Sequence, residues 1–112
     1  MASIRQNKVA RLLQKELGDI FQRESRNLFP GKMVTVTVVR VTADLSLARV
    51  YLSIFPGNNR EKVIGDINHQ GKHIRHELGN RVRHQLRLVP ELQFFIDDSL
   101  DYVENIDELL KS

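Results

Sequence analysis

The sequence contains no cysteine, and it lacks long apolar runs. Without cysteine, disulfide bonds, thiolate metal sites and cysteine nucleophiles are all excluded. Charged residues occur throughout the first 25 positions, and no stretch approaches the roughly 18 consecutive apolar residues of a membrane span. We therefore expect a cytoplasmic protein that is neither exported nor held in a membrane.

Linkers, internal repeats and low-complexity tracts are also absent, so residues 1–112 are expected to form a single domain. No nucleotide-binding glycine loop and no nucleophile elbow occurs in the chain. The sequence therefore predicts a protein that is not an enzyme, and we expect no cofactor and no metal.

The charge of the chain is unevenly distributed. Residues 1–96 hold 16 lysines and arginines against 8 acidic residues, whereas residues 97–112 hold one lysine and six acidic residues. A basic body followed by an acidic extension suggests a polyanionic partner, most commonly a nucleic acid. A solvated basic face without any partner is the alternative interpretation.

The first half of the chain predicts a helix and a hairpin. Ser3 is a plausible N-cap, and apolar residues spaced by three and four follow it up to Phe21, before Pro30 interrupts the helical pattern. The segments from Met33 to Thr42 and from Ser46 to Phe55 are rich in β-branched residues and predict two antiparallel strands. Asp44 between them can accept a backbone hydrogen bond and stabilise the turn.

The second half returns to a helical period from Arg60, and Val89-Pro90 is expected to end that run. Gly71 lies inside the apolar stripe, which predicts either a kink or close packing against the sheet. Residues 92–96 predict a third strand, and residues 97–112 an acidic extension with a short terminal helix. This order predicts an α+β protein in which helices cover one face of a three-stranded sheet.

Several local stretches resemble one known family. Residues 34–55 contain an Asp-Leu turn followed by Ala-x-Val-Tyr, and residues 74–99 contain Arg-x-x-Pro-Glu-Leu after a basic helix. Together with the first helix, RQNKVARLLQKELGDIF, these features resemble the ribosome-binding factor A family over nearly the whole chain. The resemblance implies a type II KH-like fold, α-β-β-α-kink-α-β, without the Gly-x-x-Gly loop of RNA-binding KH domains. The family's Ala-x-Gly kink is His69-Gln70-Gly71 here.

The resemblance also implies a function in the bacterial cytoplasm. Members of such a family are expected to bind the free 30S ribosomal subunit through 16S rRNA near the subunit neck. Binding would assist late maturation and processing of that rRNA without catalysis, and we expect the protein to act as a monomer.

The candidate rRNA-binding residues come from two helices. On a helical wheel of residues 71–87, a basic stripe runs beside the apolar one, and basic residues dominate the segment. Such a stripe could follow the phosphates of folded rRNA, or it could simply be a solvated helix face. The main candidates are Lys72, Arg75, His76, Arg81, Arg83 and Arg87, and the first helix adds Lys8, Arg11 and Lys15.

The sequence is also compatible with two interpretations other than rRNA binding. A metal-dependent enzyme could use His69, His73 and His76, although the sequence suggests no nearby carboxylate that would complete the ligand set. A protein-interaction adaptor could use an exposed strand edge or the acidic extension. Phe94 and Phe95 should point to opposite faces of the last strand, with one in the core and the other packed under the terminal helix or stacked on a base.

Overall fold

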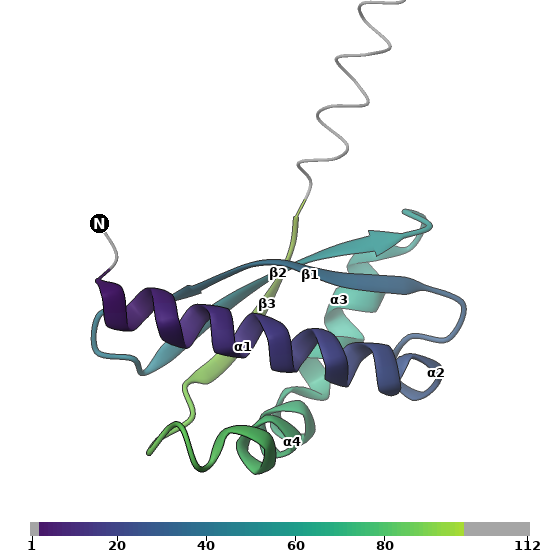
Figure 1. Cartoon of the computed structure of the whole chain (residues 1–112). Coiled ribbons are helices and arrows are strands. Elements are labelled where there is room, and N and C mark those ends of the chain that lie inside the picture. The colour runs from purple at the N-terminus through teal and green to yellow at the C-terminus, as the bar shows by residue number, and fades with distance from the viewer. Residues whose placement is uncertain (1–2, 98–112) are drawn as a thin grey trace, which may run out of the picture.

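A computed structural model describes residues 3–97 of the chain. The elements follow the order helix, short helix, hairpin, two helices and strand, as Figure 1 shows. Their bounds are α1 Ile4–Arg23, α2 Ser25–Leu28, β1 Met33–Val41, β2 Leu47–Phe55, α3 Arg60–His69, α4 Gly71–Val82 and β3 Glu91–Ile96. The predicted terminal helix falls in residues 98–112, outside the described residues. Within residues 3–97, no helix is both long and apolar enough to cross a bilayer.

The three strands form one mixed sheet in the order β1-β2-β3. The predicted hairpin is confirmed, since β1 and β2 pair antiparallel with Met33 opposite Phe55 and Val41 opposite Ala48. A bulge between Val36 and Val38 shifts the register. Strand β3 runs parallel to β2, with Phe94 beside Val50. A parallel pair needs a crossover, and helices α3 and α4 supply it.

Helices cover one face of the sheet, as the element order predicts (Figure 1). Helix α1 begins at the predicted N-cap, where the Ser3 hydroxyl accepts from the Gln6 amide and the Gln6 side chain accepts from the Ser3 amide. This reciprocal capping box satisfies two helix-end donors. The core lies between α1, α3, α4 and the inner face of the sheet, and Leu13, Ile67 and Leu78 are fully buried there.

The long helical run contains the predicted kink but ends earlier than expected. The helix breaks at Gln70, so α4 starts at Gly71, and a Cβ atom at position 71 would have no neighbour within 4 Å from other described parts of the fold. Gly71 therefore marks a kink and not a close approach to the sheet. His69 at the end of α3 is exposed, so the histidine that stands where the resembled family has alanine lies at the surface.

The prediction that helix continues to Val89 is wrong. Helix α4 ends at Val82, and the amides of Gln85 and Leu86 both donate to the Val82 carbonyl in a closing turn. Leu86 keeps the four-residue apolar spacing and packs against the core from the loop. The periodicity thus continues although the helix does not.

Asn68 on α3 forms hydrogen bonds with backbone groups at the free edge of β3. Its side-chain amide donates to the Phe94 carbonyl, and its carbonyl accepts from the Phe94 amide, each at 3.1 Å. The side chain thus pairs with the strand as another strand would. An edge strand otherwise presents unpaired backbone groups.

We expect Asn68→Ala to lower the free energy of unfolding by about 1–2 kcal/mol, because two backbone groups of Phe94 lose their partner. Urea denaturation monitored by circular dichroism measures the change. Asn80→Ala is the control, since Asn80 is exposed on α4. Equal stability of the two variants would contradict a role for Asn68 at the strand edge.

Candidate nucleic-acid interface

A groove of ≈ 1000 Å³ brings together basic residues that are far apart in the sequence. Its walls are the first turns of α1, the β1–β2 turn and the loop before β3. The basic residues that line it are Arg5, Lys8, Arg75 and Arg87, whereas among residues 3–97 the acidic lining residues are Asp44 and Glu91. The structure therefore places Lys8 from the secondary patch beside Arg75 and Arg87 from the main one. Arg5 was missed, because sequence spacing does not show that this end of α1 faces the later loop.

The β1–β2 turn shapes one wall of the groove. Asp44 accepts hydrogen bonds from the Ser46 hydroxyl, the Thr42 hydroxyl and the Ser46 amide, which lowers the pKa of its carboxyl group. The predicted turn role of Asp44 is thus confirmed. Leu45 follows with a positive φ of 62°, and its partly buried side chain packs against the core. That packing offsets the roughly 1–2 kcal/mol cost of a left-handed backbone at a non-glycine residue.

Arg75 holds the opposite wall in place. Its guanidinium group donates to the Val89 carbonyl at 2.6 Å and to the Pro90 carbonyl at 3.2 Å. These bonds connect α4 to the loop that carries Arg87 and the exposed Leu88. Arg75 therefore fixes the loop that forms this wall, and its positive charge stays at the groove.

Arg81 makes ion pairs within the protein. Its guanidinium group bonds to the Asp19 carboxylate, and it lies 3.3 Å from the Glu16 carboxylate. Its side chain is only 24% exposed. The hydrogen bond from Arg81 lowers the pKa of Asp19, and Arg23 lowers it further. Arg81 thus connects α4 to α1, where its charge is already compensated.

We expect Arg81→Met to lower the free energy of unfolding by about 1 kcal/mol, because two α1 carboxylates lose their shared cation. Binding to any polyanion should change less than about twofold, because the charge of Arg81 is neutralised within the protein. Denaturant melts and binding assays on the same preparation measure both quantities. Arg40→Met is the control, since Arg40 is exposed on β1 and lies outside the groove. A loss of binding at unchanged stability would contradict the ion-pair role.

The remaining basic candidates lie on exposed surfaces outside the groove lining. Lys72 and His76 are exposed on α4, and Arg83 is the residue after its last turn. Arg11 is exposed on α1, and Lys15 follows it one turn later on the same helix. The expected continuous stripe through Arg83 and Arg87 does not form, because the helix ends at Val82.

The histidines are arranged differently from the expected set of three. His69 ends α3, whereas His73 and His76 lie on α4 beyond the break. The expectation that no carboxylate lies near them is wrong: Glu24 and Glu77 both place a carboxylate oxygen within 4.8 Å of a ring nitrogen of His73. Glu77 follows His73 by one helical turn, so this pair could have been found from the sequence spacing alone.

Phe94 and Phe95 point to opposite faces of β3, as predicted. Phe94 is buried and packs edge-to-face on Phe21. Phe95 is 39% exposed and stacks on Tyr51 of the neighbouring strand, with ring centroids 5.5 Å apart. Contact of the outer ring with the terminal helix or with a stacked base stays a prediction.

A mixed three-stranded sheet, helices on one face and a helix break in place of a Gly-x-x-Gly loop define a small α+β domain of the KH-like type. The sequence profile described as ribosome-binding factor A matches residues 5–110. The chain is 47% identical over 108 residues to ribosome-binding factor A of Christiangramia forsetii, covering 96% of this chain and 82% of that protein. The chain therefore belongs to the ribosome-binding factor A family.

Structural comparison supports the fold assignment. The crystal structure of ribosome-binding factor A from Thermus thermophilus has the same fold, with a TM-score of 0.68 at 24% identity over 81% of this chain and 94% of that chain. A Thermus thermophilus RbfA homology model fitted into a cryo-EM map of a 30S–RbfA complex gives a TM-score of 0.64 at 27% identity, covering 80% and 91% of the two chains.

Proposed function

We propose that this protein binds the free 30S ribosomal subunit through 16S rRNA and assists late maturation of that rRNA without catalysis. The observation that carries the proposal is the family match across residues 5–110. The related Thermus protein was fitted into a map of its complex with 30S. The basic groove supplies a surface of suitable charge for such a partner.

The mechanism follows from differential binding. A folded protein that binds one rRNA conformation more tightly than another shifts the population toward the first, with no bond made or broken. The Ser3 capping box, the hydrogen bonds between Asn68 and Phe94, and the Arg81 ion pairs hold the helices and strands in a fixed arrangement. Lysine and arginine side chains that contact phosphates release counterions, so binding must weaken as salt rises.

Among the candidate residues, we propose that Arg5, Lys8 and Arg87 contact phosphate and that Arg75 mainly positions the loop. Arg5, Lys8 and Arg87 are exposed, whereas Arg75 bonds to two carbonyls of that loop. Arg81 would act through the packing of α1 on α4. The other exposed candidates would extend the contact beyond the groove: Lys72, His76, Arg83, Arg11 and Lys15.

Co-sedimentation of the purified chain with 30S subunits across a salt series tests the proposal, with 50S subunits as the control. We expect binding to 30S only, with a logarithm of the affinity that falls linearly with the logarithm of salt concentration. Binding to neither subunit would favour a protein-interaction adaptor. For the maturation step, depletion of the protein from its host should increase 16S rRNA with unprocessed ends; normal ends would contradict that part of the proposal.

A further inference from the structure

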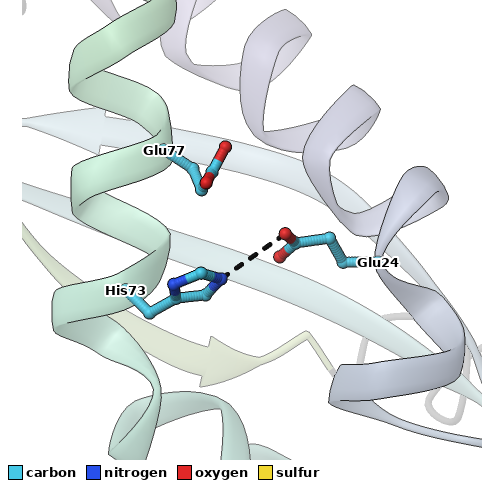
Figure 2. A group of neighbouring side chains, drawn as sticks. All are labelled: Glu24, His73 and Glu77. Carbon is cyan, nitrogen blue, oxygen red and sulfur yellow. Dashed lines mark hydrogen bonds and ion pairs between the residues drawn. The ribbon is translucent and has the colours of Figure 1, made fainter.

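A cluster of three metal-ligating side chains lies at the junction of α1, α2 and α4, outside the basic groove. Glu24 occupies the residue between α1 and α2, and His73 and Glu77 lie one turn apart on α4. Figure 2 shows the Glu24 carboxylate pointing across to the imidazole of His73, with Glu77 above it on the same helix. One ligand atom from each residue lies within 4.8 Å of the other two.

We propose that Glu24, His73 and Glu77 bind one divalent transition-metal ion such as Zn²⁺ or Co²⁺. This inference is independent of the proposed function, because none of the three residues lines the groove.

The electrostatics of the cluster favour a bound cation. The Oε1 atom of Glu24 lies 3.4 Å from Nε2 of His73, while Oε2 of Glu24 is inaccessible to solvent and has no hydrogen-bond partner among the described residues. A buried carboxylate oxygen without a partner is costly. Arg81, one turn beyond Glu77, already pairs with carboxylates of α1. A metal ion would provide Oε2 with a partner and offset the repulsion between the two carboxylates.

The ligand types indicate which metals fit. One imidazole nitrogen and two carboxylate oxygens suit Zn²⁺, Co²⁺ and Mn²⁺, whereas Mg²⁺ and Ca²⁺ favour oxygen ligands throughout. The His73 side chain is 49% exposed, so water can complete the coordination sphere from the open side. Small side-chain rotations are needed to bring the three atoms to a common ion, because metal–ligand distances are about 2 Å.

Metal binding would connect the end of α1 to the first turns of α4, directly after the break at Gln70. An ion that binds only the folded state stabilises it by mass action. A saturating metal should therefore raise the melting temperature by about 5 °C in a domain of this size.

Titration calorimetry of the full chain, purified without a histidine tag and treated with chelator, tests the proposal with Zn²⁺ and Co²⁺. We expect one ion per chain and a visible absorption band with Co²⁺. Glu24→Gln and His73→Gln should each weaken binding at least about 10-fold. His69→Gln and His76→Gln are matched controls, since both histidines are exposed and lie outside the cluster.

Circular dichroism of each variant separates loss of a ligand from loss of the fold. Unchanged affinity in folded Glu24→Gln would overturn the proposal, as would equal losses in the controls. No binding and no melting shift with the unmodified chain would show that the cluster is only an ion pair. Because 30S binding is measured separately without added Zn²⁺ or Co²⁺, failure here leaves the proposed function unaffected.

Discussion

Replacing Phe21 with alanine is expected to lower the free energy of unfolding by about 4 kcal/mol, which is a large part of the roughly 5–15 kcal/mol of a small domain. Phe21 is fully buried, and its ring packs edge-to-face on Phe29 and on Phe94, each with centroids 5.8 Å away. The ring thus joins α1, the segment after α2 and β3. Its removal leaves a cavity where three parts of the chain meet, in addition to losing buried apolar surface.

Phe55→Ala is the matched control, since it deletes the same side chain where 66% of the residue is exposed. That change should cost less than about 0.5 kcal/mol. Urea denaturation of both variants, followed by far-UV circular dichroism, compares the two losses directly. Similar values for Phe21→Ala and Phe55→Ala would show that the three-ring contact does not organise the core.

The elements that the sequence predicted well are those with strong local signals. The hairpin from Met33 to Phe55 follows from β-branched alternation, and the first helix from its Ser3 cap and apolar spacing. Gly71 predicted either a kink or close packing against the sheet, because a mid-helix glycine is unfavourable, and the structure has the kink. In each case neighbouring residues determine the conformation, so a short window of sequence contains the necessary information.

The errors arose where tertiary contacts decide the outcome. Leu86 continues the apolar period of α4 because the core needs an apolar residue there, although the backbone has already left the helix. Asn68 pairs with β3 across 26 residues, and the groove requires Arg5 to face a loop that comes much later in the chain. No local pattern encodes such proximity, since it depends on how α1 packs across the sheet and α4.

The same packing decides which basic residues can act together. Arg75, Arg81 and Arg87 looked equivalent in the sequence, as positive charges on one basic segment. In the structure, Arg75 bonds to loop carbonyls, Arg81 pairs with α1 carboxylates and Arg87 lies exposed at the groove. Counting charges therefore overestimates the number available to a nucleic acid.

Neutralising Arg5, Lys8 and Arg87 together by substitution with glutamine should weaken 30S binding about 100-fold at moderate salt. Within residues 3–97 none of the three side chains makes a hydrogen bond or an ion pair, so their removal should leave the fold intact. If each contacts one phosphate, the slope of log affinity against log salt should decrease by about 3. Co-sedimentation across a salt series gives both the affinity and the slope.

A triple variant that removes Arg26, Arg40 and Arg49 instead is the matched control. It loses the same charge from exposed positions outside the groove, two of them on the open face of the sheet. If only net charge attracted the subunit, both triple variants would lose affinity equally. A loss confined to the control would place rRNA outside the groove, near Arg26 or on the open face beside the Tyr51–Phe95 stack. A loss confined to the groove variant is the result that the geometry favours, because in the groove cations from α1 and from the loop before β3 converge on one concave surface.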